Sequence, residues 1–163
     1  LTTSSAASDV YKRQTEPSLY LVRAKVIDRD GVSHGSRIDV TENKLGPMSL
    51  LRYRDLSTNS EDVILEELVG AIRANSELHL GFYNLANNIS LKVHAFQLLP
   101  GIGKSKAQKM VQSRGMAGWM EFSEVDEACE IDSVQLLAER YLIEIEDPLN
   151  NRSILDHLIR SSN

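Results

Sequence analysis

The chain has 163 residues, of which 42% are hydrophobic and 25% charged, and its formal net charge at pH 7 is −5. A chain of this size can bury one hydrophobic core or two small ones, and it has no apolar run near the ~20 residues that a membrane span needs. The single cysteine, Cys129, excludes an internal disulfide framework and a multi-cysteine zinc or iron–sulfur site. We therefore expect a cytoplasmic protein that does not enter a membrane.

The amino-terminal residues lack the pattern of a folded domain. Residues 1–14 are mostly small and polar, without periodicity and without the apolar core of a signal peptide. Residues 5–14 resemble read-through of a sequencing adapter more than native protein. We therefore expect residues 1–16 to be a disordered, non-native tail.

The next part of the chain predicts strands. Residues 19–28 alternate between apolar and polar positions, which is the period of a half-buried strand. Residues 35–40 predict a second short strand. A third strand is expected over residues 49–56, with Arg52 and Arg54 on its outer face.

The hydrophobic period becomes helical from Ser60 onward, and Ser60 is the expected N-cap. The predicted helices begin near residue 60, cover residues 77–86, 90–98 and 104–112, begin again near residue 123, and cover residues 132–145 and 154–159. Asp132 and Gln135 form a modest capping box for the helix over residues 132–145. Because a β region precedes an all-helical region, the order predicts an α+β fold and argues against a βαβ sheet.

Positive charge is concentrated in one stretch of this acidic chain. Residues 78–120 hold five Lys or Arg and no Asp or Glu, so the rest of the chain carries a charge of −10. Local fields, which the net charge does not report, steer charged ligands to a surface. This stretch is therefore the expected site for a polyanion.

A helix–hairpin–helix element is predicted inside the basic stretch, at Leu99-Pro100-Gly101-Ile102-Gly103-Lys104. Pro100 ends the preceding helix, and Gly101 and Gly103 permit positive φ and leave room for a phosphate. The helix that begins at Lys104 would direct its N–H groups and its positive dipole end at that phosphate. The alternative is an ordinary turn between two helices that happens to use Pro and Gly.

These features predict a non-catalytic protein that binds the backbone of RNA or DNA without regard to base sequence. The expected nucleic-acid-binding residues are Gly101, Ile102, Gly103, Lys104, Ser105, Lys106, Lys109, Arg52, Tyr53 and Arg54. The last three would stack on bases and contact phosphates, although an ordinary exposed strand face explains them equally well.

No catalytic residue, metal ligand or cofactor is expected, with the exception of a monovalent cation at the hairpin loop. His79 and His94 have no spacing typical of metal ligands. The six acids of residues 121–132 favour a solvated helix face over a metal-dependent nuclease. A second turn over residues 128–134 is acidic and lacks glycine, so it would brace the first turn and would not bind phosphate.

The order of these elements resembles the archaeal domain-of-unknown-function 655 family. The matching segments are residues 35–40, 51–57, 97–104 and 134–140, and the resemblance covers residues 18–145. It implies an OB-like barrel joined to a helical domain with this hairpin, a role in RNA or nucleotide binding, and no known reaction. The family begins with a segment that supplies an early strand, and residues 1–14 do not match that segment, so we expect an incomplete barrel.

The predicted organisation therefore has four parts. They are the tail at residues 1–16, an incomplete OB-like β subdomain at 17–57, a helical domain with the hairpin at 60–146, and a linker with a short terminal helix at 147–163. The tail beyond Asp147 has no clear counterpart in the family.

Two other functions stay open. An adaptor would dock a basic protein, such as a ribosomal protein, through the acidic carboxy-terminal region. A nuclease or repair enzyme would also use the hairpin. Glycosylases with this hairpin carry a catalytic Asp after a Gly-Pro-Asp turn, however, and residues 115–119 contain no such turn.

Overall fold

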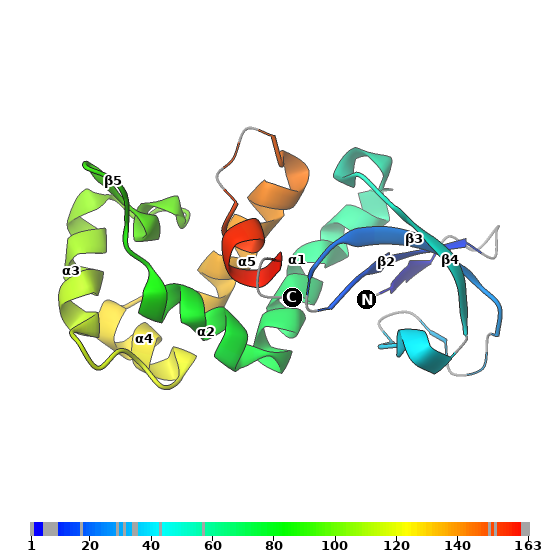
Figure 1. The fold of residues 1–163 in the computed structure, drawn as a ribbon, viewed down its shortest axis with the longest axis horizontal. Coiled ribbons are helices and arrows are strands. Elements are labelled where there is room, and N and C mark those ends of the chain that lie inside the picture. Colours follow the sequence, from blue (N-terminus) through cyan, green and yellow to red (C-terminus); the bar gives the residue numbers. More distant parts are fainter. Residues whose placement is uncertain are drawn as a thin grey trace. The chain divides into compact units, whose positions relative to one another are not determined.

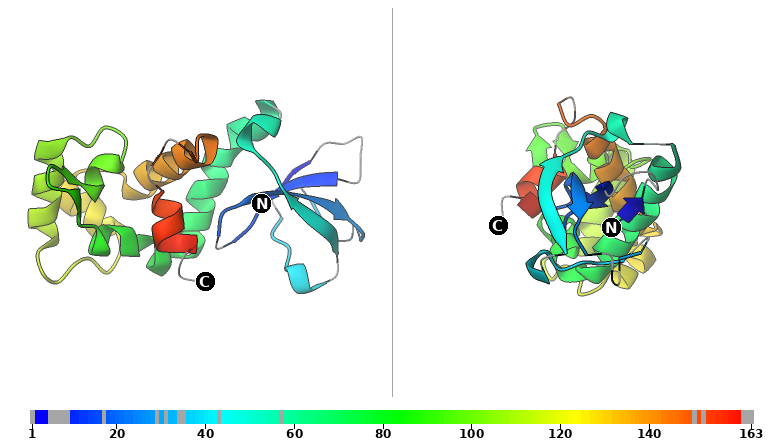
Figure 2. Two further views of the ribbon diagram at one scale, coloured as in Figure 1. Left: turned by 45° about the horizontal axis from the view of Figure 1, so that its top comes forward. Right: turned by 90° about the vertical axis from the view of Figure 1, so that its right-hand side faces the viewer.

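The computed structural model describes residues 2–4, 10–16, 18–28, 30, 32–33, 36–42, 44–56, 58–149, 151 and 153–160. The chain separates into two compact units, Leu1–Glu67 and Leu68–Asn163. Strands dominate the first unit and helices the second (Figure 1, Figure 2). The predicted α+β class is confirmed.

The first unit contains an antiparallel sheet with the strand order β1-β2-β3-β4. The strands are β1 (Thr2–Ser4), β2 (Val10–Gln14), β3 (Leu21–Val26) and β4 (Leu45–Leu50). In β3 the side chains of Val22, Ala24 and Val26 are buried and those of Arg23 and Lys25 are exposed, as the alternation predicts. Among the described strands β1 and β4 are the sheet edges, and closure into an OB-like barrel stays a prediction.

The prediction that residues 1–16 form a disordered tail is wrong for β1 and β2, which lie within this range. Val10 pairs with Lys25 and Gln14 with Leu21, so β2 lies along β3 from Leu21 to Lys25. These main-chain hydrogen bonds depend on the partner strand and not on side-chain periodicity. A pattern search along residues 1–14 therefore misses them.

The second predicted strand is also wrong, and the third is misplaced. Residues 36–39 are irregular, Gly35 lies outside the described residues, and a 3-10 turn, η1 (Val40–Glu42), follows. The Asp39 carboxylate accepts hydrogen bonds from the N–H (2.8 Å) and hydroxyl (2.7 Å) of Thr41, and such local bonding competes with strand pairing. The strand predicted over residues 49–56 lies earlier in the chain, as β4, and ends at Leu50.

The segment with the two arginines forms a 3-10 turn, η2 (Tyr53–Asp55), instead of a strand end. The Asp55 carboxylate accepts a hydrogen bond of 3.3 Å from the N–H of Arg52 and closes the turn. Arg52 and Arg54 are exposed and Tyr53 is half-buried, and because the segment is a 3-10 turn these three residues do not form a strand face.

Most predicted helices are confirmed. They are α1 (Thr58–Ala74), α2 (Ser76–Leu85), α3 (Lys104–Arg114), α4 (Phe122–Cys129), α5 (Ser133–Glu146) and a last turn of π-helical spacing, η4 (Leu155–Arg160). Ser60 is not the N-cap, because α1 already begins at Thr58. Asp132 caps α5 by accepting from the N–H of Gln135 (3.0 Å), but the Gln135 side chain donates to Glu139 and leaves the capping box half-formed.

The helix predicted for residues 90–98 is wrong. A short hairpin stands there, in which β5 (Asn88–Ser90) pairs with β6 (Val93–His94), and the 3-10 helix η3 (Ala95–Leu98) follows. The His94 ring nitrogen Nδ1 accepts from the N–H of Phe96 (3.1 Å), and the Gln97 side chain accepts from the N–H of His94 (3.0 Å). This reciprocal pair starts η3 only at residue 95.

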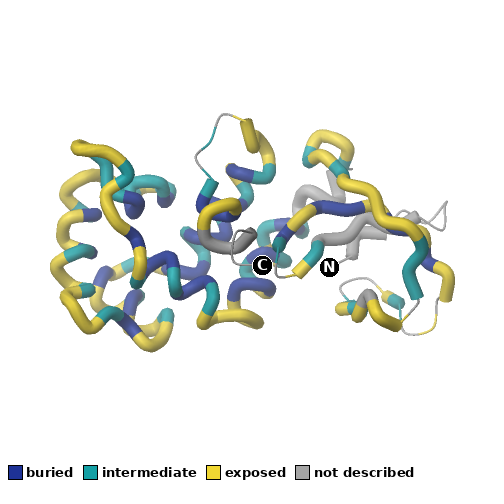
Figure 3. Tube along the Cα trace, in the orientation of Figure 1, coloured by how far each residue is buried: buried dark blue, intermediate teal, exposed yellow. Residues whose placement is uncertain are grey.

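Aromatic side chains form the core of the second unit, and Figure 3 shows buried stretches on α2, η3 and α5. The ring of Tyr83 lies 6.1 Å from those of Phe96 and Phe122. Phe82 meets Tyr83 edge to face at 5.3 Å. Leu85, in the last turn of α2, is by contrast 70% exposed.

Candidate nucleic-acid interface

The turn before α3 is a tight reversal that Gly101 makes possible. The carbonyl oxygen of Leu99 accepts a hydrogen bond of 3.2 Å from the N–H of Ile102. Pro100 and Gly101 occupy the two central positions, and Gly101 has a φ of +75°. This is the pattern of a type II turn, which favours proline at its first central position and needs positive φ at its second. Leu99 is buried and anchors the turn to the core.

The backbone conformation of Gly103 differs from that of Gly101. Its φ of −85° and ψ of 178° are extended values that any residue adopts, and it is the N-cap of α3. The positive φ that a glycine permits is therefore not used at this position. A β-carbon built on Gly101 or on Gly103 would meet no atom within 4 Å among the described residues. Both α-carbons therefore face open space through which a ligand can approach.

The first turn of α3 offers hydrogen-bond donors. The N–H groups of Lys104, Ser105 and Lys106 precede the first intrahelical bond, which runs from Ala107 N–H to the Gly103 carbonyl oxygen (2.9 Å). No side chain of the described residues caps this end of the helix. Unsatisfied amides and the positive end of the helix dipole together favour an anion here.

The outward face of α3 is polar and free of acids. Its exposed residues are Lys104, Ser105, Gln108, Lys109, Gln112 and Ser113. Ala107 and Met110 lie on the opposite side and are buried. The two exposed lysines, Lys104 and Lys109, therefore lie on a face that carries positive charge and hydrogen-bonding groups only.

Two other basic residues of the stretch have structural partners. The Lys106 ammonium donates to the carbonyl oxygen of Cys129 at the end of α4. The Arg114 guanidinium donates to the carbonyl oxygens of Tyr83, Asn84 and Ala86. Cations at helix ends compensate the negative end of the helix dipole. Lys106, which is predicted to bind nucleic acid, therefore also has a structural contact with α4 that its sequence position does not reveal.

The remaining candidates of the sequence analysis lie elsewhere. Arg52, Tyr53 and Arg54 belong to the first unit, whereas the glycine turn belongs to the second. The structure thus brings together the candidates from Gly101 to Lys109 and leaves the arginine-tyrosine segment on a separate unit.

The acids that follow α3 mostly close turns. Glu124 accepts from the N–H of Met120 (2.6 Å), and Asp126 accepts from the N–H of Ser133 (2.7 Å). Glu130 has a left-handed φ of 53° and ends α4, so the chain does turn here without a glycine. In the described part of the chain no three His, Cys, Asp or Glu side chains group as metal ligands would.

The two histidines have structural partners. The Nδ1 atom of His79 lies 3.0 Å from the hydroxyl oxygen of Tyr141, and burial lowers the pKa of His79 to about 4. His94 caps η3, and burial together with the charge of Arg114 lowers its pKa as well. Burial also raises the pKa of the Cys129 thiol, which agrees with the buried environment of that side chain.

Fold and site thus define a small α+β protein whose helical unit presents a Pro-Gly turn before a basic helix without a side-chain cap. The chain belongs to the family described as "Protein of unknown function (DUF655)", whose model matches residues 13–155. The match extends past both ends of the expected range of 18–145. It includes the last two residues of β2 and residues 148–155, which are part of the tail for which no counterpart was expected.

Two relatives are consistent with this membership. The chain is 22% identical over 106 residues to the uncharacterized protein MJ0038 of Methanocaldococcus jannaschii, a match that covers 65% of this chain and about half (49%) of that relative. The crystal structure of Af1531 from Archaeoglobus fulgidus, a DUF655 protein, has the same fold, with a TM-score of 0.75 and 18% identity. That similarity covers 90% of this chain and 84% of the other. Within the described residues no helix is both long and apolar enough to cross a membrane.

Proposed function

We propose that this protein binds the phosphate backbone of nucleic acid, without reading base sequence and without catalysis. The observation that supports this most directly is the open amino terminus of α3, which no described side chain caps and which follows two glycines facing open space. A phosphate oxygen at this position would accept hydrogen bonds from the N–H groups of Lys104 and Ser105.

Side chains on the same face would strengthen the grip. The α-carbons of Lys104 and Lys109 are separated by about 7.5 Å along the helix axis, so the two ammonium groups can contact different phosphates. The Ser105 hydroxyl, also exposed, can donate to the first phosphate. Because none of these groups distinguishes one base from another, the affinity would depend on salt and not on sequence.

Three further points belong to the same proposal. A monovalent cation would bind at the hairpin loop. Arg52, Tyr53 and Arg54 would add a weaker contact from the first unit. The location would be cytoplasmic, where a lone cysteine such as Cys129 stays reduced.

A binding series tests the proposal. Matched single- and double-stranded DNA and RNA are titrated at one salt concentration and then over a salt range. We expect the logarithm of the binding constant to fall linearly with the logarithm of the salt concentration. The variant Lys104→Ala should weaken binding to all four ligands. The control Arg73→Ala, which removes an exposed charge from α1, should have little effect.

The same series separates the rival functions. If none of the four ligands binds, the proposal is wrong, and a pull-down at moderate salt then tests the adaptor role of the acidic region. Incubation with nicked and abasic DNA in the presence of magnesium tests for an enzyme. Cleavage by the parent protein would contradict the non-catalytic part of the proposal.

A further inference from the structure

The helical unit also contains an open pocket of about 300 Å³, close in sequence to the glycine turn. Its wall is mostly apolar and includes the side chains of Phe82, Ala86, Ala95 and Leu98. These residues come from α2, from the segment that follows it, and from η3. Pockets of this volume with apolar walls and a few polar groups are typical of small-molecule sites.

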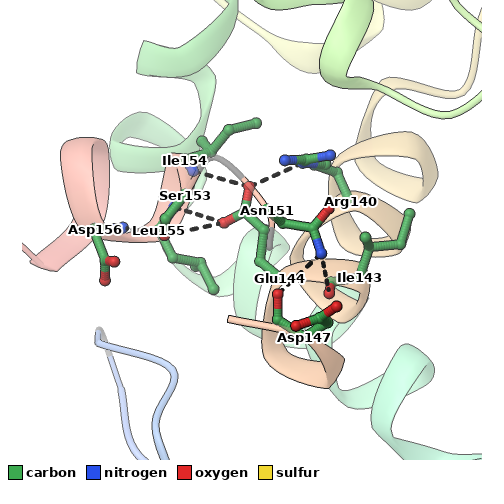
Figure 4. Close-up of polar contacts among 9 residues, drawn as sticks. All are labelled: Arg140, Ile143, Glu144, Asp147, Asn151, Ser153, Ile154, Leu155 and Asp156. Atoms are coloured by element: carbon green, nitrogen blue, oxygen red, sulfur yellow. Dashed lines mark hydrogen bonds and ion pairs between the residues drawn. The ribbon is translucent and has the colours of Figure 1, made fainter. Parts of the chain in front are cut away.

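The carboxy-terminal segment contributes Ser153, Ile154 and His157 to the lining of the pocket, and a buried carboxylate fixes this segment in place (Figure 4). Glu144, only 3% exposed, accepts hydrogen bonds from the N–H groups of Ile154 (2.8 Å) and Leu155 (3.0 Å) and from the Ser153 hydroxyl (3.3 Å). The Arg140 guanidinium pairs with the same carboxylate at 2.9 Å. Ser153 and Ile154 line the pocket, so the buried Glu144 carboxylate holds this part of its wall in position.

The pocket lies on an element that neighbours the proposed phosphate site, because Leu98, which lines it, belongs to η3, and η3 packs against α3. The proposed phosphate donors, the N–H groups of Lys104 and Ser105, follow Leu98 by six and seven residues, which span at most about 25 Å of chain. A single strand of a few nucleotides can span such a separation. The pocket residues include no Asp, Glu, Lys or Arg among the described lining, which suits an uncharged ring system beside a charged backbone.

We infer that the pocket takes an unpaired base of a single-stranded nucleic acid whose backbone continues to the amino terminus of α3. This inference rests on the proposed function and names its ligand class. The flat face of the base packs on the apolar wall that includes Phe82. The carboxamides of Asn87 and Asn88, which also line the pocket, donate to and accept from the base edge.

Duplexes are excluded from this arrangement by their own geometry. A paired base is stacked on both faces and its edge is occupied by its partner, so it must be unstacked before it can enter a pocket. Asparagine both donates and accepts, so the two carboxamides can serve different bases. The pocket therefore selects single strands over duplexes without strong sequence preference.

The test compares two short single strands with the same number of phosphates, a tetrathymidylate and its fully abasic counterpart. Because every base is missing from the second strand, sliding of the protein cannot restore the contact. With the parent protein we expect the abasic strand to bind at least about fivefold more weakly. A short duplex should also bind more weakly than the single strand. Equal affinity for the two single strands at one salt concentration would overturn the inference.

A pocket-filling variant localises the effect. Ala95→Leu places a larger side chain in the pocket, so it should weaken binding of the tetrathymidylate and leave the abasic strand unaffected. The matched control is Ala128→Leu, at an exposed position of α4. If Ala95→Leu unfolds, which circular dichroism reports, the comparison of strands on the parent protein still decides.

The outcomes distinguish the two proposals. If both strands bind equally and Lys104→Ala weakens both, the phosphate site stands and the base pocket is wrong. If neither strand nor the duplex binds, both proposals are wrong.

Discussion

The guanidinium of Arg114 donates a hydrogen bond of 2.6 Å to the carbonyl oxygen of Ala86, the residue that ends α2. The same nitrogen lies 3.1 Å from the Tyr83 carbonyl oxygen, and the guanidinium carbon lies 5.6 Å from the centre of the Phe96 ring. The last residue of α3 thus ties that helix to the end of α2 and to the core. Arg114 belongs to the basic stretch of the sequence, yet its guanidinium makes contacts within the protein.

Replacing Arg114 should therefore change stability. The variant Arg114→Ala leaves carbonyl groups at the end of α2 without their charged donor. We expect the free energy of unfolding to fall by about 2 kcal/mol, measured by urea denaturation. Lys109→Ala, an exposed change on the same helix, should alter it by less than about 0.5 kcal/mol. An Arg114→Ala protein as stable as its parent would show that these contacts contribute nothing.

The three lysines of α3 should separate into two groups. Lys104→Ala and Lys109→Ala remove exposed charges and should each reduce the slope of log affinity against log salt by about 0.7 to 0.9. Lys106→Ala removes the donor to the Cys129 carbonyl, so it should lower stability and change the slope less. A reduction for Lys106→Ala as large as for the other two would mean that Lys106 leaves α4 to bind phosphate.

The two glycines of the turn should also respond differently. Gly101→Ala forces a β-carbon to a φ of +75° and should cost about 1 kcal/mol of stability. Gly103→Ala meets no such strain, because φ is −85°, so its cost should be smaller, a few tenths of a kcal/mol from the poorer N-cap that alanine makes.

A bulkier change at the second glycine isolates the binding role. Gly103→Val keeps the lysines and should abolish most binding to nucleic acid, because its side chain occupies the space in front of the α3 amino terminus. Circular dichroism must first show intact helices. A folded Gly103→Val protein with parental affinity would leave the lysines alone as the source of binding.

Stability should depend on pH through His79. Burial lowers the pKa of this imidazole from 6.5 to about 4, so between these values the unfolded chain binds the proton and the folded protein does not. Stability rises with pH wherever the unfolded state binds more protons. As pH falls from 6.5 to 4, His79 should therefore destabilise the fold by about 3 kcal/mol.

The variant His79→Gln provides the control for this titration. Glutamine does not ionise and can still hydrogen-bond the Tyr141 hydroxyl. We compare the unfolding free energies of parent and variant from pH 7 to pH 4. The value for the parent minus that for the variant should decrease as the pH falls, because only the parent loses stability through His79. A difference that does not vary with pH would contradict the assignment to His79.

Local chemistry in the sequence determined much of this protein. The helical period placed α2 and α3 to within two residues at each end, and the alternation of β3 marked its buried face. Pro100 and Gly101 form the predicted turn because their φ preferences are properties of the residues themselves. The amino terminus of α3 follows from that turn.

Tertiary structure decided the features that depend on distant partners. Residues 10–14 became a strand because β3 supplies the hydrogen bonds. His94 and Gln97 replaced the predicted helix at 90–98 by a capped 3-10 turn after a hairpin. Lys106 reaches a carbonyl 23 positions away and Arg114 one 28 positions away. Which lysines face solvent, and where the pocket lies, depends on such long-range contacts, because main-chain carbonyls look alike in sequence and only folding determines which cation reaches them.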